Sequence, residues 1–567
     1  MNKAALTRFI IVALYISAFI GVMLGLVGGF QTGIACTAIV FFSILSYKYP
    51  RIGLWGLLIY LPFSGSIIYS IGDVYQSMGE RITYSENHPL FHLIKDAFYL
   101  PALIALIQSR DSFWKLLPRS ILKPLLIAIA LVLAVALITF GLVNLPQQFD
   151  PQVQGSPFLM GILGLKGLVG YIPLLLCGYY LIRDRTDLFF LTRLHLIVIL
   201  ICCSLAFLQY LWLVTGLCPS SNSLTGEAVY RASLQARCLV GGSLLYNPKV
   251  GLIRLPGTFV APWQWGWFLI SSAFFTYGAS VSDSSRRWRL VGWVAMVAVL
   301  AAAVISGQRI ALAIVPATFV LLLLLTDRHK GWLPIKLGIG VLLAIWITQT
   351  LGKVEERVIS LVDRWEASPP PTFMLNQFQW VWSRQQGWLG HGLGRATNAA
   401  RRLGETQLIE TYYAKLFYEI GPVGVVAFLA LVSLLTFLTF KAYRSIQDAS
   451  LQRLGLCLWV FVLFISYNTY YYPLAVDPVE VYYWFFAGVL LKLPKLDDPV
   501  GSEAGEAGGA GEAGGAGEAG GAGGAGGAGG AGEQGKQEEQ GKRGKQGKRG
   551  KQGSRSREDR FIRGVLG

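Results

Sequence analysis

Two arginines lie at the edges of apolar segments, where a charge is costly unless it reaches water or binds a partner. Arg254 begins the segment Arg-Leu-Pro-Gly-Thr-Phe-Val-Ala-Pro-Trp-Gln (254–264), which leads into an apolar stretch. Arg309 ends the turn Ser-Gly-Gln-Arg between two apolar stretches. A guanidinium is a planar fork that suits phosphate oxygens, and a Gly-Pro-punctuated helix start frees amides that favour anions. Both arginines therefore predict an anion site, and the alternative for each is an anchor at the lipid head groups.

Two other residues have side chains that can accept a proton. Glu410 precedes a predicted helix, and a carboxylate takes the proton of a hydroxyl when its pKa is tuned. An acid at a helix N-terminus is equally explained by the helix dipole. His391 lies in Gly-His-Gly-Leu-Gly (390–394), where three alternate glycines permit a tight bend. Either residue is a candidate general base.

Sequence motifs of other enzyme classes are absent. The chain contains no GxxxxGK[ST] phosphate loop, no HExxH and no GxSxG. None of its five histidines has a second ligand at metal spacing, so we predict no metal and no cofactor. Cys218 and Cys238 share a polar loop, and an oxidising compartment would allow a disulfide between them, although the sequence leaves their pairing open.

The composition describes the scaffold that must position these residues. The chain has 567 residues, of which 53% are apolar and only 14% are charged, and its mean hydropathy is +0.50. Soluble proteins carry roughly 25% charged residues, so the chain is not a soluble enzyme, a disordered regulator or a nucleic-acid-binding domain. Residues 495–567 hold 12 Lys and Arg against 11 Asp and Glu, so most of the net charge of +17 lies among the hydrophobic segments. Membrane orientation accounts for such an excess.

The chain contains about 14 apolar segments that are candidate membrane-spanning helices, each of which needs about 20 residues. They are 9–28, 32–47, 52–71, 90–107, 122–143, 159–182, 188–214, 259–281, 290–306, 310–326, 334–351, 412–440, 456–472 and 479–493. We therefore predict an all-α, polytopic transmembrane bundle over residues 1–494, with a large external loop at 352–411 before a late helix. Residues 495–567 are low-complexity and rich in glycine, which cannot offset the ordering entropy of a fold, so we predict a disordered cytoplasmic tail.

The short loops alternate in charge. With the N-terminus inside, the cytoplasmic connections carry Lys or Arg, while the external connections 143–158 and 473–478 carry none. This is the positive-inside pattern, and it places both termini in the cytoplasm. Two external loops, 215–258 and 352–411, break the pattern with several basic residues, and few acids lie near the first. The basic residues of the second loop include Arg384, Arg395, Arg401 and Arg402. Either these arginines pair with acids of the same loop, or they form a basic basin for an anionic ligand, which is the interpretation we favour.

Four short elements, in this order, resemble the O-antigen ligase and polymerase superfamily of bacterial membrane glycosyltransferases. They are Arg254 with Gly257-Thr258-Phe259 and Pro262, then Ser306-Gly307-Gln308-Arg309, then Gly390–Gly394, then Glu419 with Gly421 and Gly424. The similarity covers roughly residues 50–490 and includes the large external loop before a late helix.

The resemblance implies a substrate and a mechanism. Members act at the outer face of the bacterial inner membrane, where they transfer a glycan from an undecaprenyl-diphosphate carrier to an acceptor hydroxyl without a metal. Arg254 and Arg309 would then hold the diphosphate, and the arginines of loop 352–411 would contact the substrate. Ligases of this family usually have His-Asn where this chain has Glu410-Thr411, so Glu410 or His391 would serve as the base. The implied partners are the lipid-linked glycan, membrane lipid and polysaccharide-assembly proteins.

Two other functions stay open. Some members of the superfamily have been described as inorganic-carbon transporters, and a transporter of a small anion would use a polar residue inside a span. Lys166, in Gly-Leu-Lys-Gly (164–167), is the best candidate for such a site, and reaching out to the membrane surface is its alternative. The missing histidine and the long tail suggest, as the third function, a non-catalytic assembly partner.

Overall fold

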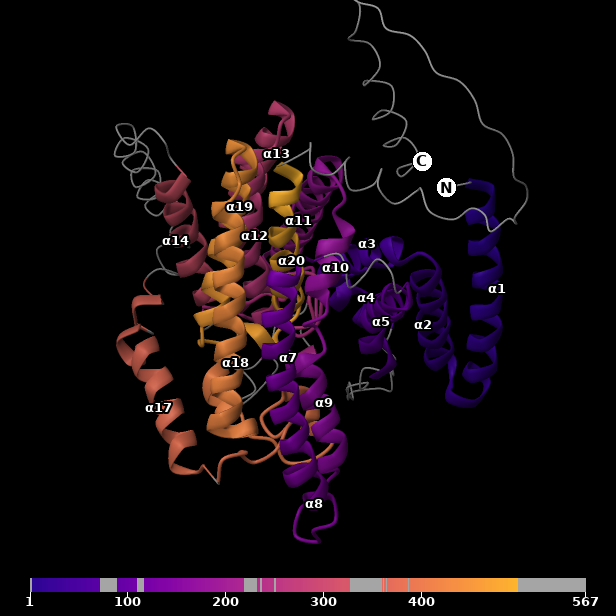
Figure 1. Cartoon of the computed structure of the whole chain (residues 1–567), viewed down its shortest axis with the longest axis vertical. Helices are drawn as coiled ribbons and strands as arrows, with labels where there is room; N and C mark the ends of the chain where they lie inside the picture. The colour runs from indigo at the N-terminus through magenta and orange to yellow at the C-terminus, as the bar shows by residue number, and fades with distance from the viewer. Residues whose placement is uncertain are drawn as a thin grey trace, which may run out of the picture. The chain divides into compact units, whose positions relative to one another are not determined.

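The computed structural model describes residues 3–71, 89–109, 117–218, 232–234, 237–248, 251–326, 359, 361–363, 365–385 and 387–497. These residues belong to one compact unit that is built mostly from helices (Figure 1). An apolar segment in a bilayer must satisfy its own backbone hydrogen bonds, and a helix does so within the segment. The prediction of a helical, multi-pass membrane architecture is confirmed at this level.

The helices of the first half of the chain are α1 (Lys3–Gly28), α2 (Phe30–Lys48), α3 (Pro50–Tyr60), α4 (Ser64–Ile71), α5 (Ile94–Gln108), α7 (Arg119–Thr139), α8 (Leu145–Gln148), α9 (Pro157–Val169), α10 (Leu174–Leu181) and α11 (Arg185–Val214). A short antiparallel hairpin follows, in which β1 (Leu245–Asn247) pairs with β2 (Leu252–Arg254). The later helices are α12 (Pro262–Ser282), α13 (Arg286–Ile305), α14 (Arg309–Thr326), α17 (Pro370–Ser383), α18 (Tyr412–Arg444), α19 (Ala449–Tyr467) and α20 (Val479–Asp497). Short 3-10 turns are η1 (Leu61–Phe63), η2 (Pro89–Leu93), η9 (Asn398–Arg402) and η10 (Pro473–Ala475), and η3 (Phe140–Asn144) is a π-helical turn between α7 and α8.

Eleven helical segments of the described residues are long and apolar enough to cross a membrane, which is fewer than the number predicted. Three of the predicted spans account for the difference. The stretch 334–351 lies outside the described residues. The stretches 259–281 and 479–493 form α12 and α20, which are helical as expected but richer in polar or charged residues than the other spans.

Helices α12 and α20 are covered by other helices rather than by lipid. Every residue of α12 from 265 to 280 is buried, and α20 is buried along most of its length. Helix α12 contacts α13, α14 and α19, while α20 contacts α10, α18 and α19 (Figure 1). The hydroxyl groups of Ser271 and Thr276 donate to carbonyl oxygens one turn earlier. Because these two hydroxyl groups bond within the helix and both helices are covered by protein, the central helices need less hydropathy than helices that face lipid.

Two glycines let α10 and α20 approach closely. A Cβ at Gly178 would lie 2.2 Å from the carbonyl oxygen of Phe485, and one at Gly488 would lie 1.9 Å from that of Leu175. Between membrane helices the hydrophobic effect supplies little attraction, so small residues that allow close van der Waals contact take its place. This crossing holds α20 in the centre of the bundle.

Candidate functional site

The segment that carries Arg254 lies directly against the turn that precedes Arg309. The backbone N–H of Leu255 donates to the carbonyl oxygen of Ser306 (2.9 Å). Gly307 has a positive φ of 68°, and a Cβ there would lie 1.8 Å from a carbonyl oxygen of strand β2. The two sequence-predicted arginines therefore belong to adjacent backbone segments, although they are far apart in the chain.

The two arginines differ in their surroundings. Arg254 ends β2 with its side chain exposed, and it forms no ion pair with any residue that the structure describes. Arg309 is half-buried and is the first residue of α14. The first turn of a helix carries unpaired N–H groups and the positive end of the helix dipole. This combination of charges suits an anionic ligand.

The residues after Arg254 are held in place by the start of α4. Thr258 is fully buried, and its hydroxyl donates to the carbonyl oxygen of Pro62 (2.5 Å). Gly65 allows this approach because it has no Cβ; a Cβ at this position would clash with the backbone of Phe259 at 2.0 Å. Thr258 and Phe259, which contribute to the family resemblance, therefore position the segment that carries the arginine.

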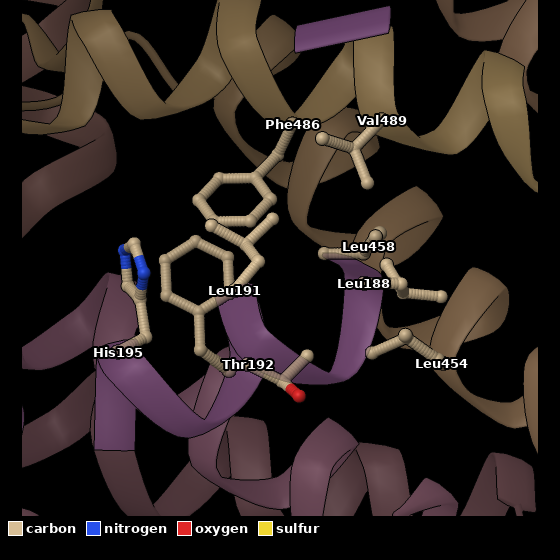
Figure 2. A pocket seen from close by; sticks show the side chains of 9 residues that line it. Leu188, Leu191, Thr192, His195, Leu454, Leu458, Phe486 and Val489 are labelled. Carbon is tan, nitrogen blue, oxygen red and sulfur yellow. The ribbon is translucent and has the colours of Figure 1, made fainter. Parts of the chain in front are cut away.

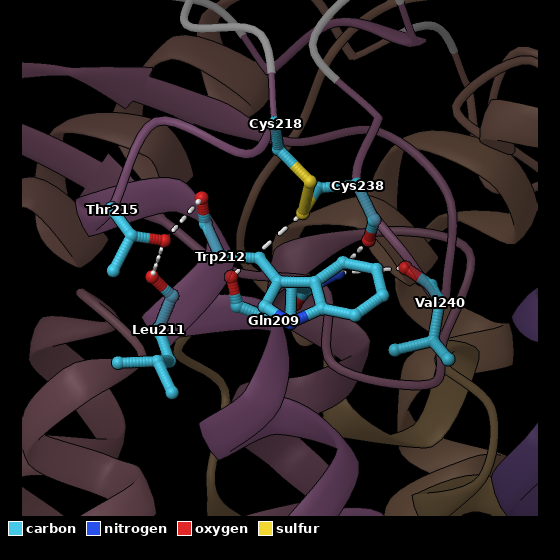
Figure 3. Close-up of a disulfide and its surroundings, with 7 residues drawn as sticks. All are labelled: Gln209, Leu211, Trp212, Thr215, Cys218, Cys238 and Val240. Carbon is cyan, nitrogen blue, oxygen red and sulfur yellow. Dashed lines mark hydrogen bonds between the residues drawn. A yellow bond between two sulfur atoms is a disulfide. The ribbon is translucent and has the colours of Figure 1, made fainter.

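A disulfide joins Cys218 and Cys238 and ties the end of α11 to the loop before β1 (Figure 3). Gln209, near the end of α11, donates from Nε2 to the carbonyl oxygens of Cys238 (2.9 Å) and Val240 (2.7 Å). The structure thus contains the disulfide that the sequence analysis considered for this loop. Disulfides persist in oxidising compartments, which agrees with the predicted external position of the loop.

The glycine-rich turn 390–394 is built into a break of helix α18. At Gly421 the backbone leaves the helical conformation, with a φ of 68°. The backbone N–H of His391 donates to the carbonyl oxygen of Tyr418 (2.8 Å). That oxygen has no donor within the helix because the residue four positions later is Pro422, which lacks an N–H. The turn therefore supplies the hydrogen bond that the broken helix cannot make.

Two buried side chains hold the rest of the turn. Glu419 is 3% exposed, and its Oε1 accepts from the backbone N–H of Ala396 (2.8 Å) and from the hydroxyl of Thr397 (3.0 Å). Asn144, fully buried between α7 and α9, accepts through Oδ1 from the backbone N–H of Leu393 (2.9 Å). Its Nδ2 donates to the carbonyl oxygen of the same leucine (2.9 Å). Glu419, another residue of the family resemblance, therefore fixes the backbone of the loop.

His391 lines a polar groove beside α17. Its ring stacks on that of Tyr418, with centroids 4.2 Å apart, and its Nε2 lies 2.8 Å from the carbonyl oxygen of Arg384. A carbonyl oxygen only accepts, so Nε2 carries the hydrogen and Nδ1 of the neutral ring keeps its lone pair. Burial lowers the pKa of His391; the hydrogen bond to Arg384 opposes this shift, and the charge of Arg395 adds to it. The ring is therefore neutral at pH 7.

The groove has a volume of about 440 Å³, with polar and aromatic walls. Its lining residues are Trp380, Ser383, Arg384, Gln385, His391, Gln407 and Tyr418. The guanidinium of Arg384 lies over the ring of Trp380, 4.2 Å from its centroid. Arg395 lies close by, where its Nη2 donates to Oε1 of Gln147 (2.7 Å). Two cations thus stand at a groove that no carboxylate of the described residues lines.

Glu410 lies in a different setting from His391. The backbone N–H of Glu410 donates to Oε1 of Gln377 in α17 (3.1 Å). Glu410 and Arg401 are both close enough to the Tyr472 phenol for their charges to influence its pKa, which burial raises. The hydrogen bonds and the ring contact of His391 go to other residues. The structure therefore does not bring the two predicted bases into contact.

The connection between α19 and α20 joins the start of α18 to α12. The backbone N–H of Tyr412 donates to the carbonyl oxygen of Thr469 (2.7 Å), and the indole N–H of Trp267 donates to that of Tyr471 (3.2 Å). The predicted anion site directly precedes α12, and Glu410 directly precedes α18. One connecting loop thus holds the beginnings of both helices.

Sequence reasoning singled out Lys166 but missed the other charged residues that cluster with it. Lys95 forms an ion pair with Asp477, and its neighbour Asp96 forms one with Lys166. Glu480, 6% exposed, lies close enough to Lys95 and Lys166 for their charges to act on it. The adjacent Lys and Asp at 95–96 were the available signal, because a charge at membrane depth is retained only with a partner. The ammonium group of Lys166 pairs with Asp96, and 37% of the Lys166 side chain is also exposed.

The four arginines predicted for the substrate loop separate into two groups. Arg384 and Arg395 lie at the groove. Arg401 and Arg402 are exposed at the end of η9, which contacts α9. Arg402 lies close enough to His92 on the neighbouring span for its charge to act there. The arginines of loop 352–411 therefore face two different places.

The apolar core contains a second, much smaller cavity around His195 (Figure 2). Its volume is about 10 Å³, which is about the room that one water molecule needs. His195 is 4% exposed, and its ring contacts those of Phe275, Tyr482 and Phe486. We interpret it as a core histidine. Within the described ranges, no group of three or more His, Cys, Asp or Glu side chains is placed to hold a metal ion.

Comparison with protein-family models gave no match, and comparison with curated proteins gave none either.

Proposed function

We propose that the chain is a membrane glycosyltransferase of the O-antigen ligase and polymerase type. It takes a glycan from an undecaprenyl-diphosphate carrier and transfers or polymerises it during surface or exopolysaccharide biosynthesis. The observation that carries the proposal is the contact between the segments of Arg254 and Arg309, in which the N–H of Leu255 donates to the carbonyl oxygen of Ser306. A diphosphate needs at least two cations from separate parts of the chain, and this contact supports such a pair.

The chemistry assigned to these residues is a displacement at the anomeric carbon. The acceptor hydroxyl oxygen bonds to that carbon while the bond from carbon to the diphosphate oxygen breaks. The electron pair leaves with undecaprenyl diphosphate, and Arg254 and Arg309 stabilise the negative charge that builds on it. The hydroxyl proton goes to the carboxylate of Glu410. We assign the base role to Glu410 because it directly precedes α18, whose beginning is held by the same connecting loop as α12, whereas His391 lines the groove beside α17.

In this proposal the chain lies in the bacterial inner membrane with both termini in the cytoplasm. The alternation of Lys and Arg between loops supports that orientation. The disulfide between Cys218 and Cys238 supports an oxidising compartment for the loop that precedes Arg254. The partners are then the lipid-linked glycan and membrane lipid, with polysaccharide-assembly proteins alongside.

A second candidate is a transporter of a small anion such as inorganic carbon. The ion pairs Lys95–Asp477 and Lys166–Asp96 favour it, because ionisable residues within membrane spans often mark ion or proton pathways. The same pairs also serve to join α5 to α9 and to the start of α20. This structural role is sufficient to explain them, so we place the transporter second.

Mass spectrometry of undecaprenyl-linked glycans in cells with and without the gene tests the proposal. Accumulated single repeat units in the deletion would identify a polymerase, and accumulated full-length chains would identify a ligase. Complementation with Arg444→Gln, an exposed arginine at the far end of α18, is the control and should restore the normal pool. An unchanged lipid-linked pool in the deletion would refute the transferase, and bicarbonate uptake would then test the transporter.

A further inference from the structure

The groove at His391 has the size of a small-molecule site. Its volume of about 440 Å³ lies within the range of roughly 300–1,000 Å³ that ligand pockets occupy. It is formed by four separate parts of the chain: the end of α17 with the two residues after it, the glycine-rich turn, Gln407 in the connection before α18, and the first turns of α18. The turn is held to α18 by the hydrogen bond from the N–H of His391 to the carbonyl oxygen of Tyr418. The walls are therefore fixed to one another before any ligand arrives.

Two planar polar groups of the groove are oriented by aromatic rings. The guanidinium of Arg384 lies over Trp380, and the imidazole of His391 stacks on Tyr418 at an interplanar angle of 22°. Each aromatic neighbour covers one face of its partner and leaves the polar edge for a ligand. Groups held in this way lose little conformational freedom on binding, which raises affinity.

The charges of the groove select an anion. Arg384 has no carboxylate partner in the part of the chain that the structure describes, and Arg395 stands nearby. Two acids lie close by without lining the groove. The charge of Glu405 acts on Arg395, and that of Glu419 acts on Tyr418, while Oε1 of Glu419 already accepts from Ala396 and Thr397. A planar guanidinium binds a carboxylate or a phosphate through two parallel hydrogen bonds. A neutral ligand would leave these donors without an acceptor.

The remaining groups of the groove suit hydroxyls. Nδ1 of the neutral His391 ring is an acceptor, because Nε2 donates to the carbonyl oxygen of Arg384. Gln407 and Ser383 add amide and hydroxyl groups to the lining. An anionic group beside several hydroxyls describes a uronic acid or a phosphorylated sugar.

We propose that this groove binds an acidic sugar residue of the glycan. The carboxylate or phosphate of the sugar binds Arg384, and one of its hydroxyls donates to Nδ1 of His391. The identity of the ligand as a glycan rests on the proposed function, whereas anion binding rests on the groove alone. The groove thereby sets which repeat unit the protein accepts.

Calorimetric titration of the purified full-length protein in lipid nanodiscs tests this assignment. The probes are trigalacturonic acid, the neutral trisaccharide maltotriose and inorganic phosphate. We expect trigalacturonic acid to bind at least tenfold more tightly than maltotriose. Arg384→Gln and His391→Gln should each weaken that binding about tenfold, and Arg384→Lys should weaken it less, since the charge remains while the fork is lost. The control Arg444→Gln, outside the groove, should not change it.

The probes also separate the two anions. If inorganic phosphate binds and its affinity also falls in Arg384→Gln, the site is assigned to phosphorylated sugars. If inorganic phosphate does not bind, the site is assigned to uronic acids. Equal binding of the two trisaccharides, or unchanged binding in Arg384→Gln, would overturn the proposal. The pool of lipid-linked glycan in the deletion is a separate measurement. If trigalacturonic acid binds but the pool is unchanged, the transferase is refuted and the anion-binding groove is kept. If the pool changes but trigalacturonic acid does not bind, only the proposal for the groove is refuted.

Discussion

Asp96 on α5 and Lys166 on α9, which are 70 positions apart in the sequence, form an ion pair between two membrane spans. The preceding residue on α5, Lys95, pairs with Asp477 in the connection between α19 and α20. Two adjacent charges therefore join one helix to two different parts of the chain. Removing one partner of such a pair leaves the other charge without compensation, which costs more than the pair itself contributes.

We expect Lys166→Met to lower the free energy of unfolding by about 1–3 kcal/mol, less than for a fully buried pair because the Lys166 side chain is 37% exposed. The double variant Lys166→Met with Asp96→Leu should recover most of that loss, since no charge is then left unpaired. Thermal unfolding in nanodiscs measures both. Arg183→Met is the control, because that arginine is 67% exposed in its pair with Asp187 and should contribute less than about 1 kcal/mol. Equal losses in Lys166→Met and Arg183→Met would contradict the prediction.

The break in α18 predicts a specific effect of a single methyl group. A Cβ at Gly421 would lie 2.2 Å from the carbonyl oxygen of Trp388, and the residue has a positive φ of 68°. Gly387 also has a positive φ, but a Cβ there would meet nothing within 4 Å. We expect Gly421→Ala to lower the unfolding temperature more than Gly387→Ala, because only the first adds a clash to a strain of about 1–3 kcal/mol. Similar unfolding temperatures for the two variants would show that the turn does not pack against α18.

The proposed diphosphate site predicts that guanidinium geometry matters as well as charge. Arg254→Lys and Arg309→Lys should each reduce glycan transfer in membrane preparations at least tenfold, because a lysine cannot form two parallel hydrogen bonds to phosphate. The amount of protein in the membrane should stay the same. Arg444→Lys serves as the matched exchange and should retain activity. Full activity in both site variants would contradict the assignment of these arginines.

Burial of His391 predicts a dependence of stability on pH. The pKa of His391 is lowered from its ordinary value of 6.5, so the unfolded chain binds more protons than the folded chain just below that pH. The contribution of His391 to the free energy of unfolding is therefore constant above pH 6.5, and it decreases as the pH falls from 6.5 to the lowered pKa. We expect His391→Gln to show a shallower decline of unfolding temperature between pH 7 and pH 5 than the native chain. Parallel declines would mean that His391 titrates normally.

Helix α17 predicts a contact with lipid. It has 14 residues and no charged side chain, and at about 1.5 Å per residue it is too short to span a bilayer. Leu375 and Trp382 on this helix are 55% and 63% exposed, while Val381 is fully buried against α18. Such a helix is expected at the membrane interface, where tryptophan is enriched.

Spin labels on Leu375→Cys and Trp382→Cys should be relaxed by oxygen rather than by a water-soluble nickel complex. A label on Asp150→Cys, exposed in the connection before α9, should show the opposite, and preferential relaxation of the α17 labels by nickel would place the helix in water.

Several features could be predicted from the sequence because each depends on a single segment. Hydropathy acts on one helix at a time, so eleven of the predicted spans coincide with helices that are long and apolar enough to cross a membrane. The stretches of α12 and α20 are helical as predicted, but they are not among those eleven. The motif residues Arg254 and Arg309 were found because a guanidinium between apolar stretches is costly wherever the chain folds. The sequence placed both cysteines in one loop and left their pairing open, and the structure joins them in a disulfide.

By itself, therefore, the amino-acid sequence determined the helical membrane architecture and the types of side chain available for chemistry. Tertiary structure alone decided which of them meet: it places the segment of Arg254 against that of Arg309, assigns His391 with Arg384 to a groove of its own, and pairs Lys95 and Asp96 with separate elements. The physical reason is that hydropathy and backbone preference are local, whereas ion pairs and stacked rings join residues that are distant in the chain. Those contacts exist only after the helices have packed.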